Sequence, residues 1–245
     1  MIKFEYTETV GWEHAIRGMR NPMNSWEKSD SFIHTSEWEL YRFGEGLPEI
    51  GPNDYDLMMK LRNAGTDHRK FMRMIDVYVD ITAPLYWWKE FDTYKVGTVA
   101  NSCSTMHKIH AKEFTLEDFS TDHLMMDEDY DHAGYVIGDT INALNYWRAL
   151  YVSITEDLKK VHFNELEKRK HLVETQKKYW WQMIQLLPSS YNQRRTLKLN
   201  YEVLANIYKS RKNHKLDEWR EFCKWIEELP YSEIITGCSA DDKEE

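Results

Sequence analysis

The spacing of apolar residues predicts strands in the first part of the chain. The clearest signal lies in residues 70–83, where apolar and polar positions alternate. Alternation with a period of two places apolar side chains on one face of a strand. We therefore predict a strand here that Pro84 closes, and a weaker edge strand over residues 2–10. The alternating apolar residues are Ile75, Val77, Val79 and Ile81.

Helical spacing marks two early segments and most of the chain after Gly138. The early helices are expected over residues 11–20 and 53–64, with Gly65 placed to end the second one. The segment LYWWKEF after Pro84 is expected to begin another helix. Strands early and helices late favour an α+β fold over regular βαβ repeats. The late helices are predicted near 139–163, 165–186, 190–212 and 215–228, with Pro188 and Pro230 as breaks.

Composition limits the classes of binding partner and the cellular compartment that we expect. The chain carries a net charge of −9, so a general affinity for nucleic acid or for anionic membranes is not expected. Three cysteines suit a reducing compartment, and the N-terminal MIKFEYTETV does not follow the pattern of a signal peptide. We expect a cytoplasmic protein without a membrane span, because no run of about 18 apolar residues occurs.

Several chemical motifs have ordinary structural explanations. The acidic residues Asp127, Glu128, Asp129 and Asp131 lie in an acidic excursion near 112–134, and the loop lacks the glycine and glutamate of an EF-hand. His107 and His110 lack further ligands at metal-site spacing, so no metal is predicted. Cys103 is expected to be an ordinary loop residue. The pairs Trp87–Trp88 and Trp180–Trp181 are expected to pack rather than to stack on a ligand. Glycine-rich phosphate loops are absent from the sequence.

Two segments resemble the flavin-dependent thymidylate synthases. That family has a Leu-Pro, a Tyr-Thr region, Asn-Leu-Arg-x-Leu, an Arg that ends the helix, and then Ala-Gln-x-Glu-Ile-Arg. The C-terminal stretch LPSSYNQRRTLKLNYEVLANIYKSRKNHKLDEWREF is similar to this order. The matching residues are Leu187, Pro188, Tyr191, Asn200, Asn206, Arg211, Glu218 and Arg220.

The second segment is APLYWWKEFDTYKVGTVANSCSTMH. The family has an Ala-Pro that leads into a helix, followed by Arg-His-Arg-x-x-Ser-x-Asn-Glu-x-Ser-x-Arg-Tyr. Ala83-Pro84 matches the start, and Thr93-Tyr94-Lys95 takes the place of Arg-His-Arg. Thr98, Asn101 and Ser104 match the first Ser, the Asn and the second Ser, with one extra residue after Thr98. The resemblance runs in order from about residue 12 to residue 228.

The resemblance implies a fold, a reaction and a set of site residues. It implies an antiparallel sheet flanked by long helices, in one domain over residues 1–245 that assembles as a homotetramer. It implies binding of FAD and of a pyrimidine deoxynucleotide such as dUMP, and transfer of a one-carbon unit from methylenetetrahydrofolate to C5, with NADPH as reductant. His68, Tyr94, Lys95, Thr98, Asn200 and Asn206 would face FAD. Glu90, Asn101, Ser104 and Arg211 would face the nucleotide, with Ser104 and Arg211 as the catalytic residues.

Departures from the family pattern leave other functions open. Thr93, Lys95, Met106 and Ile184 stand where the family has arginines. Each lost arginine removes a bidentate contact to a phosphate or carbonyl. A catalytically altered member that binds a nucleotide, or acts as an assembly partner, is the alternative. A helical interaction protein whose late helices are similar to the family by chance is a third.

Overall fold

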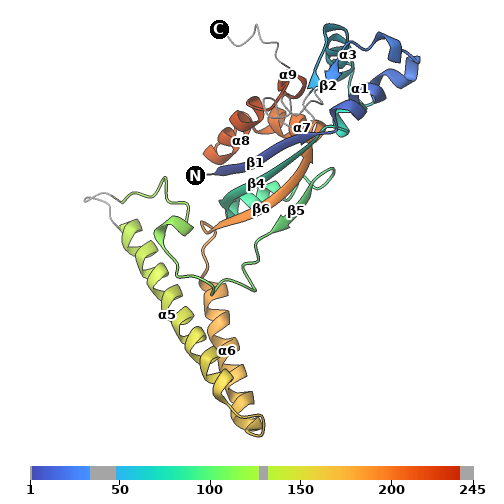
Figure 1. Cartoon of the computed structure of the whole chain (residues 1–245). Coiled ribbons are helices and arrows are strands. Elements are labelled where there is room, and N and C mark those ends of the chain that lie inside the picture. Colours follow the sequence, from blue (N-terminus) through green and yellow to red (C-terminus); the bar gives the residue numbers. More distant parts are fainter. Residues whose placement is uncertain (1, 34–47, 127–131, 238–245) are drawn as a thin grey trace. The chain divides into compact units, whose positions relative to one another are not determined.

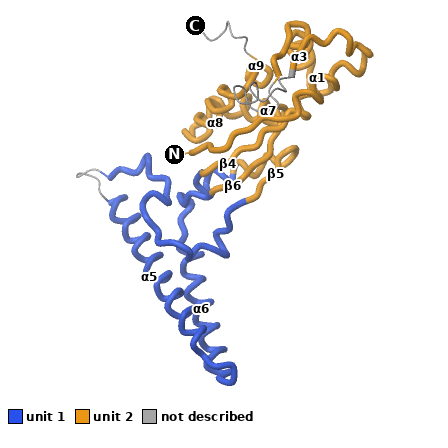
Figure 2. Tube along the Cα trace, in the orientation of Figure 1, with its two compact units in different colours: residues 1, 83–89, 102–193 blue, residues 2–82, 90–101, 194–245 orange. Residues whose placement is uncertain are grey.

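The computed structural model describes residues 2–33, 48–126 and 132–237. These residues divide into two compact units, which Figure 2 shows in different colours. The expectation of one domain over residues 1–245 stays a prediction. The sheet unit contains residues 2–82, 90–101 and 194–237, and the hairpin unit contains residues 83–89 and 102–193.

A four-stranded antiparallel sheet with strand order β1-β4-β6-β5 forms the centre of the sheet unit (Figure 1). In the pair of β1 and β4, Lys3 lies opposite Thr82 and Val10 lies opposite Asp76. The combination of this sheet with separate helices confirms the predicted α+β fold class. The strands are β1 (Lys3–Val10), β4 (Asp76–Pro84), β6 (Asn192–Asn200) and β5 (Val99–Ser102), and a second, two-stranded sheet pairs β2 (Phe32–Ile33) with β3 (Pro48–Glu49).

The strand predicted over residues 70–83 begins later than expected. Residues Arg69–Arg73 form the 3-10 helix η3, and β4 starts at Asp76. Within β4 the predicted alternation holds, because Val77, Val79 and Ile81 are all buried. The sequence pattern therefore located the buried face of the strand correctly and its first residue incorrectly.

The helix predicted over residues 190–212 is wrong in its first half. Residues 192–200 form β6, and α7 (Tyr201–Arg211) follows directly. Leu197 and Leu199 are fully buried and two residues apart, which is the spacing of a strand with one buried face. Asn200 then caps α7 by accepting a hydrogen bond from the backbone N–H of Val203 at 3.0 Å.

Aromatic side chains join helices to the sheet and to one another. Phe4 of β1 stacks on Trp225 of α8, with ring centroids 5.1 Å apart. Trp12 of α1 meets Tyr201 of α7 edge to face at 5.2 Å. These contacts bury the side chains of Trp12 and Trp225. The helices of the sheet unit are α1 (Trp12–Arg20), α3 (Pro52–Asn63), α7, α8 (Asp217–Glu227) and α9 (Glu233–Thr236). The helix α4 (Leu85–Phe91) begins in the hairpin unit and ends in the sheet unit.

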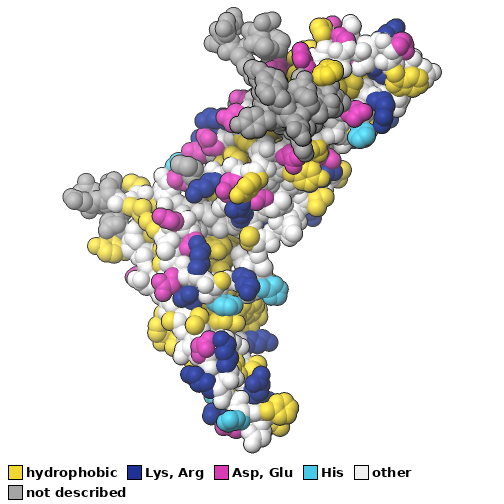
Figure 3. Space-filling view, viewed as in Figure 1, with side chains coloured by type: hydrophobic (Ala, Val, Ile, Leu, Met, Phe, Trp, Pro, Cys, Tyr) yellow, Lys and Arg dark blue, Asp and Glu magenta, His cyan; other side chains and the backbone are white. Residues whose placement is uncertain are grey.

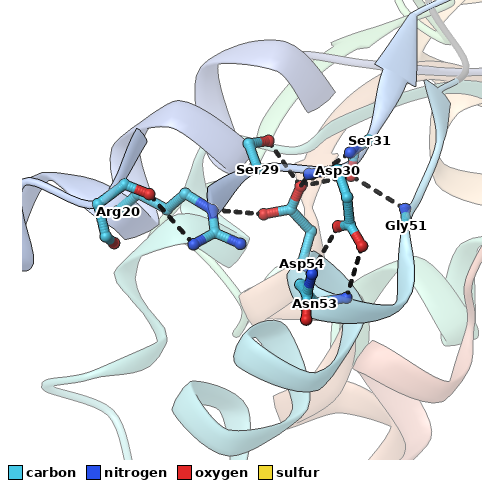
Figure 4. Close-up of polar contacts among 8 residues, drawn as sticks. Arg20, Ser29, Asp30, Ser31, Gly51, Asn53 and Asp54 are labelled. Carbon is cyan, nitrogen blue, oxygen red and sulfur yellow. Dashed lines mark hydrogen bonds and ion pairs between the residues drawn. The ribbon is translucent and has the colours of Figure 1, made fainter. Parts of the chain in front are cut away.

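A buried polar network fastens α1 to α3 (Figure 4). The Asp54 carboxylate accepts hydrogen bonds from Nε of Arg20 at 2.6 Å and from the hydroxyls of Ser29 and Ser31 at 2.7 Å. The carboxylate of Asp30 accepts the backbone N–H groups of Asn53 and Asp54, and so caps the first turn of α3. Arg20 and Asp54 are both buried, so each charged side chain needs the opposite charge of the other to offset the cost of its burial.

The hairpin unit is built on two long helices, α5 (His132–Lys160) and α6 (Leu166–Leu186). A cluster of apolar side chains joins these two helices to the segment that precedes α5. Along the hairpin, the face seen in Figure 3 carries side chains of both charges. Within the described ranges, no helix is both long and apolar enough to cross a membrane. The cluster comprises Ile109, Phe114, Phe119, Ile137, Leu144 and Met183.

The acidic excursion near 112–134 is partly described. Its ordered part includes the 3-10 helix η4 (Leu116–Asp118), which has a capping box between Thr115 and Asp118. Residues 127–131, which carry the whole acidic run, lie outside the described residues. The following helix starts at His132 rather than near residue 139.

The tryptophan pairs pack as predicted where they are buried. Trp87 and Trp88 are fully buried, and the indole N–H of Trp88 donates to the carbonyl of Gln193 at 2.9 Å. Trp180 packs against the apolar cluster of the hairpin unit, whereas its neighbour Trp181 is exposed.

Replacement of two glycines by alanine is expected to change the stability of the protein in opposite directions. Gly11 precedes α1 with φ +90°, and a Cβ there would lie 2.1 Å from the carbonyl oxygen of Met74. Gly138 lies inside α5 with nothing within 4 Å of such an atom. We expect Gly11→Ala to lower the free energy of unfolding by about 2 kcal/mol or more. Gly138→Ala should raise it by about 0.5–1 kcal/mol. Urea unfolding of both variants checks this, and shifts in the same direction would contradict it.

Candidate functional site

Arg211 at the end of α7 joins two segments that are far apart in the sequence. Its Nε donates to the hydroxyl of Tyr94 at 2.9 Å, and its Nη1 donates to Glu90 Oε2 at 3.0 Å. Glu90 lies in α4 and Tyr94 follows that helix. Three residues that the resemblance implied for cofactor and nucleotide binding therefore meet within the sheet unit.

Aromatic rings hold the Arg211 guanidinium in place. Its carbon lies 4.7 Å from the ring centre of Trp219 and 5.6 Å from that of Tyr94, within the range of cation–π attraction. The indole N–H of Trp219 donates to the same Glu90 oxygen at 3.0 Å. Nε2 of His214 lies 3.6 Å from that oxygen. The charge of Arg211 is thus both fixed in position and compensated by Glu90.

The loop after Tyr94 lies against the start of α7. Gly97 has φ +77°, and a Cβ there would lie 2.8 Å from Nδ2 of Asn200 and 2.9 Å from Cγ2 of Val203. Only glycine allows this approach without strain. Gly97 therefore lets the loop between Lys95 and Thr98 approach Asn200 at the start of α7. The binding roles of Lys95, Thr98 and Asn200 stay predictions.

A hollow of about 350 Å³ opens beside this loop. The Thr98 hydroxyl oxygen is buried and has no hydrogen-bond partner among the described residues. A buried polar atom without a partner costs about 1–3 kcal/mol, which a ligand that hydrogen-bonds to it would recover. The residues that line the hollow are Phe91, Asp92, Tyr94, Lys95, Thr98 and Ala100.

A second cavity, of about 390 Å³, lies beside α7. Asn206 lines it, and its side-chain oxygen accepts from Nη2 of Arg69 at 3.3 Å. Arg69 also pairs with Glu202, with 3.4 Å between Nε and Oε1. The lining residues are Arg62, Asn63, Gly65, Arg69, Ala205, Asn206, Tyr208, Lys209, Lys212, Ile235 and Thr236.

Three of the expected site residues stand apart from these groups. His68 is exposed and does not line the second cavity, although its neighbour Arg69 does. Asn101 is exposed on β5. Ser104 belongs to the hairpin unit, where its hydroxyl accepts the backbone N–H groups of Met106 and His107 at 3.2 and 3.0 Å. Their roles in binding stay predictions.

Several charged residues that line the second cavity, or that pair with a residue lining it, were not predicted from the sequence. Glu202, Lys209 and Lys212 all lie in or next to α7, and Ala205, Tyr208, Lys209 and Lys212 follow the i, i+3, i+4, i+7 spacing of one helical face. That spacing could have grouped the two lysines. No local signal could have paired Arg69 with Glu202, because they are 133 residues apart.

Metal-binding clusters do not occur among the described side chains. His110 lies against the ring of Tyr151, with centroids 4.5 Å apart. Burial, then the charges of Lys108 and Arg148, lower the pKa of His110, so the imidazole is neutral near pH 7. Cys103 is an exposed free thiol.

Comparison with known proteins identifies the fold of this chain. No protein-family model and no curated protein matches the sequence. Among solved structures, thymidylate synthase X (ThyX) from Helicobacter pylori with FAD and dUMP matches with a TM-score of 0.60 at 15% identity. That match covers 97% of this chain and 99% of the other. The chain has the ThyX fold.

A second structure of ThyX, the flavin-dependent thymidylate synthase from Helicobacter pylori in complex with FAD and dUMP, gives the same result. Its TM-score is 0.58 at 16% identity, with 97% of this chain and 98% of the other covered. The ThyX fold therefore extends over nearly all of the chain and includes both the sheet and α7. The fold expected from the two sequence motifs is confirmed.

Proposed function

We propose that this protein is a divergent flavin-dependent thymidylate synthase. The reaction is transfer of a one-carbon unit to C5 of a pyrimidine deoxynucleotide with reduction, from dUMP to dTMP or a variant of it. FAD is the cofactor, with methylenetetrahydrofolate and NADPH as co-substrates, and a homotetramer is the proposed assembly.

The observation that carries the proposal is the meeting of Arg211 with Glu90 and Tyr94. Residues 90 and 94 come from one matched motif and residue 211 comes from the other, yet they are joined by hydrogen bonds of 2.9 and 3.0 Å. A chance resemblance of two unrelated segments gives no reason for their key residues to touch. The ThyX fold of the whole chain adds independent support.

The residues present around the hollow fit a flavin. The unpartnered Thr98 hydroxyl and the Lys95 side chain offer polar groups, and Tyr94 and Phe91 offer aromatic faces. When bound, FAD would supply the hydride that reduces the transferred carbon. Lys95 adds positive charge beside the cofactor, while Asn200 and Gly97 fix the loop that holds it.

Arg211 is the residue proposed to orient the nucleotide. A guanidinium next to a uracil carbonyl favours the negative charge that develops on the ring during attack at C5. Glu90 and Trp219 hold the guanidinium in one orientation, so it does not need to reorganise when the nucleotide binds. Ser104 is proposed to face the same nucleotide.

A binding protein without catalysis is the second candidate, and one observation favours it. Glu90 already compensates the Arg211 charge at 3.0 Å, and Trp219 covers its face. An anion must compete with this internal carboxylate, while the arginines expected at positions 93, 95 and 106 are absent. Such a member would bind a nucleotide or a partner subunit and release no dTMP.

The visible absorbance spectrum of the purified protein tests the proposal. We expect bound FAD, stabilisation of the protein against heat by dUMP, and formation of dTMP when methylenetetrahydrofolate and NADPH are supplied. Stabilisation by dUMP without product would support the binding protein instead. Protein that stays colourless after addition of FAD would overturn the flavoenzyme.

Arg211→Ala is expected to weaken dUMP binding by about 10- to 100-fold, the value of a charged hydrogen bond. Calorimetric titration of dUMP measures this loss. Lys224→Ala is the matched control, because Lys224 is another cation of the same region whose side chain pairs with Glu221 and is 66% exposed. Equal losses in the two variants would remove Arg211 from the nucleotide site.

A further inference from the structure

A third cavity, of about 190 Å³, lies beside α1 in the sheet unit. Four of its lining residues follow the i, i+3, i+4, i+7 spacing of one helical face. No residue that is proposed to bind FAD or the nucleotide lines this cavity. The described lining residues are Glu13, Ile16, Arg17 and Arg20 of α1, followed by Trp26, Ser29 and Ser31.

Arg20 places a buried hydrogen-bond donor at the wall of this cavity (Figure 4). Its side chain is 4% exposed, and it donates from Nε to Asp54 Oδ1 at 2.6 Å and from Nη1 to the carbonyl of Ser25 at 3.3 Å. The other oxygen of Asp54 already accepts the hydroxyls of Ser29 and Ser31 and two backbone N–H groups, so no lone pair is left for Nη2. Nη2 of Arg20 has no acceptor among the described residues and is available to a ligand.

Glu13 and Arg17 leave one charge of each sign at the cavity, because Asp54 already compensates the charge of Arg20. Within the described parts of the chain the Glu13 carboxylate forms no ion pair, although Arg17 lies four positions along the same helix. Nη2 of Arg17 lies 3.1 Å from Nδ1 of His14 instead. A simple anion would be repelled by Glu13 and a simple cation by Arg17, whereas a zwitterion satisfies both.

The rest of the lining offers apolar surface to a small molecule. Ile16 is buried, and Trp26 is exposed although its indole N–H is fixed by donation to Asn21 Oδ1 at 2.8 Å. A fixed aromatic ring beside an aliphatic side chain is typical of a site for an apolar group. The volume of about 190 Å³ lies between the roughly 150 Å³ of a cavity that holds benzene and the roughly 300 Å³ or more of pockets for drug-sized ligands.

We infer that this cavity binds a free α-amino acid with an apolar side chain. The carboxylate of the ligand accepts hydrogen bonds from Nη2 of Arg20 and from Arg17, and a guanidinium matches a carboxylate in geometry. The ammonium group pairs with Glu13, and the apolar side chain packs on Ile16 and Trp26. This site goes beyond the proposed function and does not depend on it.

Calorimetric titration of the full-length protein with L-leucine, L-methionine and L-phenylalanine tests the inference. Two analogues of leucine each lack one of the charged groups. Leucinamide has no carboxylate, and isocaproate has no ammonium group. Each analogue should bind at least about tenfold more weakly than leucine, the value of one charged hydrogen bond.

Glu13→Gln tests the contact with the ammonium group. It should weaken leucine binding by about 5- to 10-fold, between the values of an exposed ion pair and a charged hydrogen bond. Binding of isocaproate should not change, a difference that a merely structural effect would not produce. Glu27→Gln is the matched control, because Glu27 is exposed in the 3-10 helix η2 (Trp26–Lys28) and does not line the cavity. It should change leucine binding by less than about twofold.

Arg20→Lys tests the contact with the carboxylate. Lysine keeps a positive charge near Asp54 but removes Nη2, so binding of leucine and isocaproate should weaken by about tenfold while leucinamide stays unchanged. If this variant fails to fold, Arg17→Ala gives the same test, because its side chain is exposed. Its loss for leucine should be about fivefold, against less than about twofold for the exposed control Lys28→Ala.

The possible outcomes keep this inference apart from the proposed function. Wild-type protein that binds no apolar amino acid at millimolar concentration would overturn the site, and so would equal affinities for leucine and leucinamide. Equal losses in Glu13→Gln and Glu27→Gln would show that leucine binds elsewhere. None of these results changes the flavin or dTMP measurements. Protein that binds leucine but stays colourless with FAD would support the amino-acid site and contradict only the flavoenzyme.

Discussion

Replacing Asp54 by alanine is expected to lower the free energy of unfolding by about 3–5 kcal/mol. The carboxylate is fully buried and accepts hydrogen bonds from Arg20, two serine hydroxyls and the backbone N–H groups of Asp30 and Ser31. Its removal leaves the buried Arg20 guanidinium without its counter-charge, and desolvated charge of this kind is costly. Urea unfolding of the variant measures the loss.

Asp56→Ala is the matched control for this prediction. Asp56 lies in the same helix, two residues from Asp54, and is exposed. Its removal should change the free energy of unfolding by no more than about 0.5 kcal/mol. If the two alanine variants lose equal stability, the effect belongs to the first turns of α3 rather than to the buried network.

The Asp54 carboxylate should also make the free energy of unfolding depend on pH in the acidic range. Burial tends to raise the pKa of Asp54, but hydrogen bonds from Ser29, Ser31 and Arg20 together with the charge of Arg20 outweigh it and lower that pKa. A lowered folded-state pKa stabilises the protein above the unfolded value of about 3.9 and loses this contribution as the pH falls through the folded value. The stability difference between wild type and Asp54→Asn should therefore shrink below about pH 4.

Local patterns predicted the elements whose burial follows a simple period. The alternation of Val77, Val79 and Ile81 predicted the buried face of β4, and Gly65 ended a helix at nearly the right residue. These features depend on residues close together in the sequence, and their physical causes are local. The fold class followed from them.

The strand β6 escaped prediction because tertiary pairing decides it. Leu197 and Leu199 alternate over too short a stretch to outweigh the helical pattern of α7 that follows. In the structure, Arg194 pairs with Asp80 at 2.7 Å and Lys198 pairs with Asp76 at 2.9 Å. These partners belong to the neighbouring strand β4, which the local sequence around β6 does not contain.

In the candidate site, too, some contacts were predicted from the sequence and others were not. Arg211, Tyr94 and Glu90 were grouped through their matched motifs, and their contact is present in the sheet unit. Two contacts were not predicted: the cation–π contact of Arg211 with the Trp219 ring, and the ion pair between Arg69 and Glu202. No motif marked them, since each depends on the way α7 packs against distant segments.

Trp219→Ala is the second substitution with a large expected effect, a loss of about 3–5 kcal/mol in the free energy of unfolding. The indole is fully buried and contacts the rings of Phe91 and Phe222, with centroids 6.3 and 5.9 Å away. Alanine would leave a cavity at this point and remove the face on which the Arg211 guanidinium rests. Urea unfolding checks the size of the loss.

Trp219→Phe separates the ring from its N–H group. Phenylalanine keeps most of the packing but removes the hydrogen bond to Glu90, so a smaller loss of about 1–2 kcal/mol is expected. Trp26→Ala is the control, because Trp26 is 48% exposed in the same unit and its loss should cost less than about 1 kcal/mol. If Trp219 orients Arg211 as well as filling the core, Trp219→Phe must weaken dUMP binding more than its small stability loss explains. Unchanged dUMP affinity in that variant would restrict Trp219 to packing.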